Sequence, residues 1–306
     1  MVAISPVVAR PTSRRSNRWR RQYTAYLYLL PALMLIVGIT YFGVGYNVWA
    51  STLDWNGIDP NPRSVGAGNF AKIALDPIFW SSLSHVAIFG VITVVVQLVI
   101  GLALALILSG PIVGRAVYKA IVFIPVVLAP AAISTAFRQF LKPDGQVNAV
   151  LDAVGLGALG QAWIADPTWA LYALAAVNIF QWTGFSFILY QAALSQIDPS
   201  HLEAAQIDGA GTWRTIRHII VPQLRSTHMT LALTGVIGSL KTFDIVFLIT
   251  GGGPGRSTEF LTTYIYKQSI TQFHVGYGAA LSVVLLILAL LLTLVQMRLY
   301  RYDQED

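Results

Sequence analysis

One face of an apolar stretch carries residues that suit the binding of a sugar. Asn178 and Gln181 stand about one helical turn apart, and Trp182 and Phe185 follow at helical spacing, so one helix would present all four on one side. Amide groups hydrogen-bond to hydroxyls, and aromatic rings offer flat apolar surfaces that suit the C–H faces of sugars. In membranes, amides also serve as hydrogen-bonding contacts between packed helices. Two interpretations therefore stay open: a binding face and a packing face.

The other chemistry-bearing residues give little support for an enzyme. The chain has no cysteine, which excludes disulfides, thiolate metal sites and cysteine nucleophiles. Its five histidines show no metal-ligand spacing with carboxylates, so we expect no metal site. Lys241 and Asp244, at positions i and i+3 of one expected helix, are the only candidates for paired catalytic groups within an apolar stretch. We interpret them as a structural ion pair near the outer end of that helix, with a gate or substrate contact as the alternative.

Two glycine-rich motifs resemble nucleotide-binding loops without meeting their requirements. Residues 155–160 match the GxGxxG pattern, but they lie in an expected loop without a strand–helix–strand context. Residues 251–258 resemble a phosphate-binding loop, yet Arg256 and Ser257 stand where that loop needs Gly and Lys. We therefore expect no ATP site in this chain.

The composition excludes an ordinary soluble protein and a disordered one. The chain has 306 residues, and its 20 Lys or Arg and 14 Asp or Glu make up 11% of it, against about 25% in soluble domains. Hydrophobic residues make up 55%, and the mean hydropathy is +0.63. So few charges cannot cover so much apolar mass in water. The sequence therefore predicts an all-α integral membrane protein.

Long intervals without charge mark the expected membrane spans. A helix needs about 20 apolar residues to cross a bilayer core of about 30 Å. Six spans are predicted, at roughly 26–50, 83–108, 119–138, 168–194, 228–250 and 275–298. The first is too long for a cleaved signal peptide. The chain is thus expected to have a basic tail at 1–25, a membrane domain at 26–298 and a short tail at 299–306.

The distribution of Lys and Arg predicts the orientation. The N-terminal tail, the second and fourth loops and the C-terminal tail carry more of these residues than the opposite face. Both termini and the loop 195–227 are therefore expected in the cytoplasm. The net charge of +6 fits this topology and a contact with anionic lipid, so we expect no nucleic-acid partner.

The loop 195–227 is expected to form two short helices joined at glycine. Asp198 is a good N-cap, and Pro199 suits the first turn of the first helix. Gly209 and Gly211 should end that helix, and Pro222 should end or kink the second. Such a pair would form a rigid knob parallel to the membrane.

This loop resembles the EAA motif in the permease subunits of ABC importers. The matching residues are Glu203–Ala205, Asp208–Ala210, Ile219, Val221 and Pro222, with Val221 at a position where the family usually has Leu. Residues 244–254 and 142–148, with Trp163 and the Asp166–Pro167 pair, resemble the carbohydrate branch, of maltose and glycerol-phosphate type. The resemblance covers nearly the whole chain.

The resemblance implies the fold, the partners and the site residues. The fold would be the type I importer permease fold, with six spans and a cytoplasmic two-helix coupling loop. The partners would be a second permease, two copies of a cytoplasmic ATPase that hold ATP and Mg²⁺, and an extracytoplasmic binding lipoprotein, all at a bacterial inner membrane. The residues that dock on the ATPase would be Glu203, Ala204, Ala205, Asp208, Gly209, Ile219 and Pro222. The substrate path for a carbohydrate would be lined by Asn178, Gln181, Trp182, Phe185, Gly235, Gly238, Ser239 and Thr242.

Several alternatives remain at this point. The substrate could be glycerol phosphate or another polyol, although no cluster of cavity arginines favours a phosphate. Trp182 stands where the family can have a small residue, which suggests a narrower or differently shaped cavity. A stand-alone secondary transporter would usually show inverted repeats and would not explain the EAA motif.

Overall fold

The computed structural model describes residues 28–302, which are mostly helical, in two units that meet between Trp49 and Ala50. The expected basic tail at 1–25 and residues 303–306 of the expected C-terminal tail lie outside the described residues. The first unit contains a helical segment that runs from Tyr28 and continues to Ser51, just past the boundary. It includes a π-helical stretch, η1 (Ile36–Tyr41), and α2 (Phe42–Ser51), and it is apolar enough to cross a membrane.

The second unit opens with a small cap of strands and one short helix. Strands β1 (Leu53–Asp54) and β2 (Arg63–Ser64) pair antiparallel, and α3 (Gly68–Leu75) follows. The buried Asn69 amide donates to the carbonyls of Ser51 (2.9 Å) and Leu53 (2.8 Å). These bonds tie α3 to the chain that runs from the end of α2 into β1.

Three long apolar helices match predicted spans. They are α4 (Pro77–Ile107), α8 (Ala170–Leu194) and α15 (Val275–Tyr302). Asp76 begins α4 as an N-cap, since its Oδ1 accepts from the Ile78 N–H at 2.8 Å and Pro77 occupies the first turn. The expected spans 83–108, 168–194 and 275–298 are thus present as helices, with ends shifted by a few residues.

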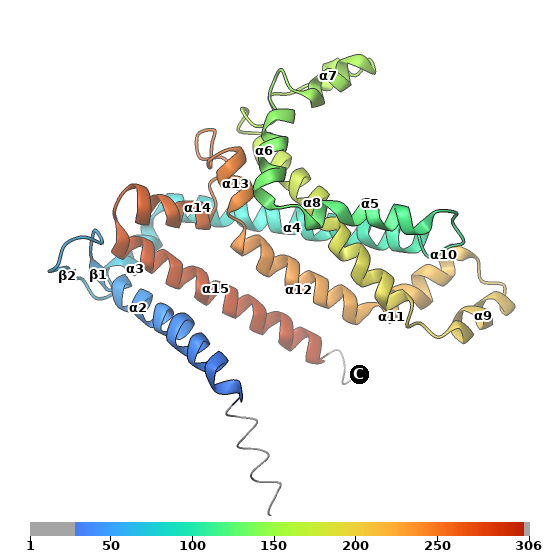
Figure 1. Cartoon of the computed structure of the whole chain (residues 1–306), viewed down its shortest axis with the longest axis horizontal. Helices are drawn as coiled ribbons and strands as arrows, with labels where there is room; N and C mark the ends of the chain where they lie inside the picture. Colours follow the sequence, from blue (N-terminus) through green and yellow to red (C-terminus); the bar gives the residue numbers. More distant parts are fainter. Residues whose placement is uncertain (1–27, 303–306) are drawn as a thin grey trace, which may run out of the picture. The chain divides into compact units, whose positions relative to one another are not determined.

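The predicted span at 119–138 is wrong as a single helix. It consists of α5 (Arg115–Val127) and α6 (Pro130–Phe140), which meet at 95° (Figure 1). Pro130 lies at the start of α6, and Leu128 and Ala129 before it are extended, with ψ of 140° and 133°. A proline disfavours the helical conformation of its predecessor, which explains the sharp corner.

The predicted span at 228–250 is also divided. Helix α12 (Arg225–Lys241) ends before Thr242, whose ψ is 120°, and α13 (Asp244–Ile249) begins two residues later. Lys241 and Asp244 therefore lie on two helices, and the expectation that they share one helix is wrong. Within the described residues, four helices are long and apolar enough to cross a membrane alone, or five if α5 and α6 form one bent span.

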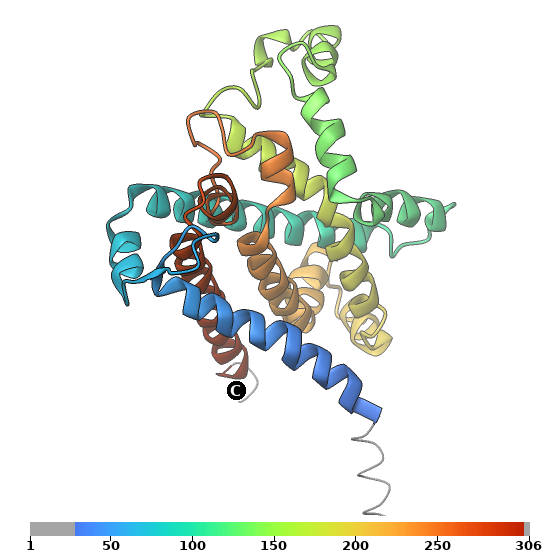
Figure 2. The ribbon, with the colours of Figure 1, turned by 60° about the vertical axis from the view of Figure 1, so that its left-hand side comes forward.

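Two extended loops carry shorter helices. After α6, the chain forms α7 (Gln146–Ala153) and the 3-10 turn η2 (Gly157–Leu159), and α6 and α7 project away from α4 in both views (Figure 1, Figure 2). After α13, it forms α14 (Leu261–Tyr266) and η4 (Lys267–Thr271). The glycines at 155–160 thus belong to an irregular turn, and not to the strand–helix junction that a dinucleotide site needs.

The core of the second unit lies where α4, α6, α8 and α13 meet. Phe89, Leu174 and Val246 are completely buried there, and Phe260 packs edge-on against Phe89 at 5.0 Å. Small residues allow the helices to approach closely: a Cβ at Gly184 of α8 would stand 2.4 Å from the Val122 carbonyl oxygen of α5. This packing fixes the face that α8 turns toward α4 and α12.

Candidate functional site

A cavity of about 330 Å³ opens between α4, α8 and α12, at the breaks that precede α6 and α13. It collects all eight residues that the sequence assigned to one path: Asn178, Gln181, Trp182, Phe185, Gly235, Gly238, Ser239 and Thr242. Helical spacing explains this result for the four residues of α8 and for Gly235, Gly238 and Ser239 of α12, because residues three and four apart lie on one face. The structure brings these residues together, and their role as a substrate path stays a prediction.

The cavity wall presents amide groups from two helices. Gln97 of α4 donates from Nε2 to Oδ1 of Asn178 at 3.0 Å. Gln181, one turn along α8, is only 2% exposed, and its Nε2 has no hydrogen-bond partner among the described residues. An unpartnered buried amide is costly, about 1–3 kcal/mol, unless a ligand or water meets it. The residues that line the cavity thus include one amide whose nitrogen has no partner in the described part of the chain.

Sequence reasoning missed the contribution of α4. Thr93 and Gln97 line the cavity from that helix. Because α4 is apolar on nearly all sides, its sequence pattern does not single out the face that meets α8. The signal available was Gln97 itself, a polar residue in the interior of a long apolar stretch, which usually faces a bundle interior or a cavity.

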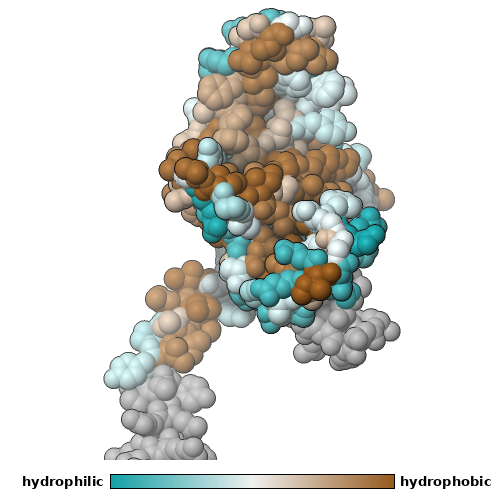
Figure 3. All heavy atoms as spheres, turned by 90° about the vertical axis from the view of Figure 1, so that its right-hand side faces the viewer, coloured by the Kyte–Doolittle hydropathy of each residue, from teal (hydrophilic) through white to brown (hydrophobic). Residues whose placement is uncertain are grey.

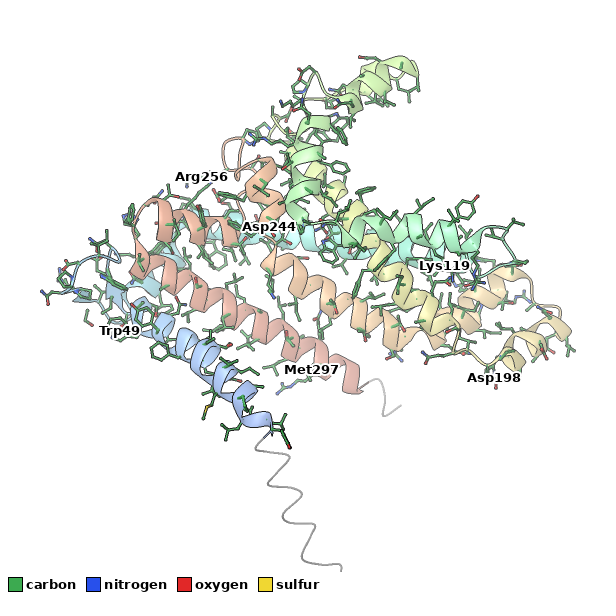
Figure 4. All side chains as sticks on the ribbon, in the orientation of Figure 1. Trp49, Lys119, Asp198, Asp244, Arg256 and Met297 are labelled. Atoms are coloured by element: carbon green, nitrogen blue, oxygen red, sulfur yellow. The ribbon has the colours of Figure 1, made fainter. Side chains whose placement is uncertain are left out.

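Aromatic and charged residues complete the cavity. Trp182, Phe185 and Phe243 supply rings, and Lys241 and Asp244 also line the wall. The predicted ion pair between Lys241 and Asp244 is wrong: in the described part of the chain the two are not in salt-bridge contact, because the backbone extends between their helices. Figure 4 shows Asp244 at the junction of α12 and α13.

The ion pair found in the described residues lies beside the loop 250–260. Lys267 Nζ donates to Oε2 of Glu259 at 2.5 Å, and the Thr263 hydroxyl donates to Oε1 at 2.6 Å. Glu259 is 1% exposed, and Thr258 Oγ1 also bonds to the Gly253 carbonyl at 2.6 Å. The GGGPGRST motif is thus a braced turn. No group of His, Asp or Glu in the described residues is arranged to hold a metal ion.

At the other end of α8, the loop 195–227 forms the expected helices. They are α9 (Pro199–Ile207) and a second helical stretch made of α10 (Thr212–Thr215), η3 (Ile216–Ile220) and α11 (Val221–Gln223). Asp198 caps α9 by accepting from the Ser200 N–H at 2.9 Å, and this bond lowers the pKa of Asp198. Gly209 has a φ of +72°, a left-handed conformation that favours glycine and turns the chain between the helices.

Most of the expected docking residues are exposed on this loop. Glu203, Ala204, Asp208, Gly209 and Pro222 are exposed, Ile219 is half-buried, and Ala205 is buried. Ala205, Asp208 and Ile219 line a second hollow, of about 440 Å³, between the two helical stretches. Hydrophilic residues gather over this end of the molecule, below a largely hydrophobic band (Figure 3). The exceptions, which the sequence reasoning did not single out, are Ile207 and Trp213, 86% and 72% exposed.

A family model described as "Binding-protein-dependent transport system inner membrane component" matches residues 2–302. The chain belongs to this family. The expected family is thereby confirmed, and this binding-protein-dependent permease is a transport subunit and not an enzyme.

Relatives of this permease match it over most of their length. A probable ABC transporter permease protein of Pyrococcus horikoshii is 35% identical over 269 residues, which cover 88% of this chain and 92% of that protein. The lactose transport system permease protein LacF of Rhizobium radiobacter is 31% identical over 289 residues, which cover 93% and 96%.

A solved structure shares the fold of the permease. It is a bacterial alginate ABC transporter in complex with an alginate pentasaccharide-bound periplasmic protein, one chain of which matches with a TM-score of 0.82. The two chains are 22% identical, and the match covers 95% of this chain and 98% of that one. The ABC importer permease fold inferred from the EAA motif is therefore present.

Proposed function

We propose that this permease moves a carbohydrate, of the di- or oligosaccharide class, through the cavity between α4, α8 and α12. The observation that carries the proposal is the unpartnered Gln181 amide beside the Asn178–Gln97 pair and the rings of Trp182 and Phe185. Amide donors meet sugar hydroxyls, and the rings supply apolar faces. The relatives that transport lactose and other sugars support the same substrate class.

The loop 195–227 would couple this path to ATP hydrolysis. The exposed Glu203 on α9 could pair with a basic groove residue of an ATPase, and small Ala204 would allow close approach. ATP and Mg²⁺ would bind only to the ATPase partner, of which the complex would contain two copies.

The full assembly would add a second permease of similar fold and a binding lipoprotein that delivers the sugar. The permease would cross the bacterial inner membrane six times, with α5–α6 and α12–α13 as the third and fifth spans. Both termini and the loop 195–227 would lie in the cytoplasm, as the Lys and Arg distribution favours.

A pull-down of the tagged permease from its native membrane in mild detergent tests the assembly. We expect an ATPase, a second six-span protein and a lipoprotein among the partners identified by mass. Binding assays with sugars and glycerol phosphate on the lipoprotein then identify the substrate class. Recovery of the permease alone, while another membrane complex stays intact in the same detergent, would contradict the proposal and favour an independent transporter.

A further inference from the structure

Polar side chains join four helices at the end of the bundle that carries the loop 195–227. Gln191 of α8 donates from Nε2 to the Ala105 carbonyl (2.5 Å) and to Ser109 Oγ (3.0 Å), at the end of α4. Lys119 of α5 donates to Oε1 of the same Gln191 at 2.6 Å. One amide therefore ties the end of α8 to α4 and to α5.

The preceding residue makes the matching connection to α12. The Tyr190 hydroxyl lies 2.6 Å from Nδ1 of His228, and the two rings meet edge-on at 5.2 Å. Tyr190 is completely buried, and Nε2 of His228 is buried without a hydrogen-bond partner in the described part of the chain. A hydrogen bond in such surroundings is stronger than one in water, because no solvent competes for either atom.

These bonds lie at the base of the coupling loop. The loop 195–227 starts one helical turn after Gln191 and ends directly before His228. Lys119 and Asp198 lie toward this end of the helices, away from Asp244 at the cavity (Figure 4). The Tyr190–His228 bond therefore joins the two helices from which the loop emerges.

We propose that Tyr190, through His228, is a positioning residue for coupling: it holds the loop-side ends of α8 and α12 together. A displacement of the loop then moves both helices as one body. Since α8 and α12 also carry the two principal walls of the cavity, the displacement reaches the cavity as a change of shape. Without the bond, each helix end follows the loop separately, and part of the displacement is lost. This inference rests on the proposed coupling role of the loop.

The test needs no identified substrate, because it measures how fast one introduced thiol is labelled. The chain has no cysteine of its own, so the introduced cysteine is its single thiol. A Gly238→Cys variant places a single thiol in the cavity, at a position where an added Cβ meets no atom within 4 Å. The complex with its ATPase partners is reconstituted in lipid vesicles, and the rate of labelling by a maleimide is measured without nucleotide and with ATP plus vanadate. The ratio of the two labelling rates reports how strongly the nucleotide state of the ATPase changes the accessibility of the cavity thiol.

We expect Tyr190→Phe in this background to reduce the nucleotide-dependent change in labelling by about threefold to tenfold, while ATP hydrolysis continues. His228→Leu should give the same reduction, and the double variant should be no worse than either single one. Tyr172→Phe is the matched control, because it makes the same substitution at an exposed position near the other end of α8.

An unchanged ratio in Tyr190→Phe would overturn the inference and leave the proposed function intact. If Tyr190→Phe does not accumulate, His228→Leu decides in the same way. Failure of the proposed function gives a different result. In that case no ATPase assembles with the parent chain, and the labelling rate does not depend on nucleotide in any variant.

Discussion

In the described part of the chain, the cavity wall contains one side chain with a buried, unsatisfied hydrogen-bond donor, Gln181. Gln181 lines the cavity and has a buried amide nitrogen without a partner among the described residues, although it sits one turn from the paired amides of Asn178 and Gln97. A helix that needed only packing would be more stable with an apolar residue of similar size there. The retained amide therefore favours a binding role over a packing role.

Replacement of this amide should separate binding from stability. We expect Gln181→Leu to raise the KM for uptake about tenfold, because a ligand hydroxyl loses an amide with which it would form a hydrogen bond. Its amount in the membrane and its melting temperature in detergent should stay unchanged or rise, since an unsatisfied group is removed. Gln196→Leu, at an exposed position after α8, is the control. A lower melting temperature with unchanged KM would assign Gln181 to packing.

A second residue, Asp76, should give the protein a pH-dependent stability. Burial raises the pKa of Asp76, but the hydroxyls of Tyr264 and Tyr277 and the Ile78 N–H outweigh burial, and the net pKa falls below the ordinary value. A depressed folded-state pKa means that the stabilisation is complete above the unfolded pKa of about 4 and is lost as the pH falls through the folded pKa.

We expect Asp76→Asn to cost about 1–2 kcal/mol of folding stability at pH 7, since a neutral amide accepts hydrogen bonds more weakly than a carboxylate. The difference in melting temperature between parent and variant should shrink below about pH 4. Melting in detergent at pH 7 and pH 3.5 checks this. Asp144→Asn, at an exposed loop position, serves as the control, and a difference that does not vary with pH would contradict the assignment.

At this scale, spacing in the sequence predicted which side chains of α8 line the cavity, and their role in binding stays a prediction. Spacing alone grouped Asn178, Gln181, Trp182 and Phe185 correctly, because an α-helix converts spacing into a shared face. The sequence did not predict Gln97 as a cavity residue, since only tertiary packing decides which side of the uniformly apolar α4 meets α8. The Lys241–Asp244 pair was mispredicted, because i and i+3 become neighbours only if the helix continues between them.

At the scale of elements, the break between α5 and α6 and the break between α12 and α13 differ in whether the sequence reveals their cause. The corner before α6 has a proline, Pro130, as its cause, and that residue can be found in the sequence. The break at Thr242 and Phe243 has neither proline nor glycine. It is held by tertiary contacts that no local pattern contains: Thr262 of α14 donates to the Thr242 carbonyl at 2.5 Å, and the Phe243 ring packs on Tyr266 of α14 at 5.5 Å.

The close packing of α8 on α5 makes a prediction for one glycine. A Cβ at Gly184 would stand 2.4 Å from a backbone oxygen of α5, so Gly184→Val should force the helices apart and cost about 1–3 kcal/mol. Gly238→Ala, where a Cβ meets no atom within 4 Å, should leave the melting temperature unchanged or raise it. Thermal melting of both variants in detergent tests the contact, and equal melting temperatures would refute it.

At the scale of the whole second unit, α8 links two distant features. Its middle carries the cavity residues 178–185, and its C-terminal end at Leu194 leads into the loop 195–227. A helix transmits a displacement along its axis with little loss, because its hydrogen bonds hold each turn to the next. The arrangement accounts for how this permease could respond to ATP hydrolysis by a partner.

The proposed coupling predicts the behaviour of loop variants. We expect Glu203→Lys, and separately Gly209→Leu, to abolish uptake in cells while the protein still inserts in the membrane. The first reverses an exposed charge on α9, and the second strains a backbone with φ of +72°. Asp152→Lys, an equally exposed charge reversal on α7, should keep its uptake. Normal uptake by both loop variants would contradict the coupling role.

The braced turn at 250–260 should keep its shape when the salt concentration around the protein changes. Dissolved ions weaken exposed electrostatic interactions much more than buried ones, and Glu259 of the Lys267–Glu259 pair is almost fully enclosed. The shape of the turn should therefore be the same at low and at high salt concentration. Arg256 at its tip is exposed and experiences the full screening. Ionic strength would thus change the reach of the positive charge of Arg256, while the shape of the turn that carries it stays the same.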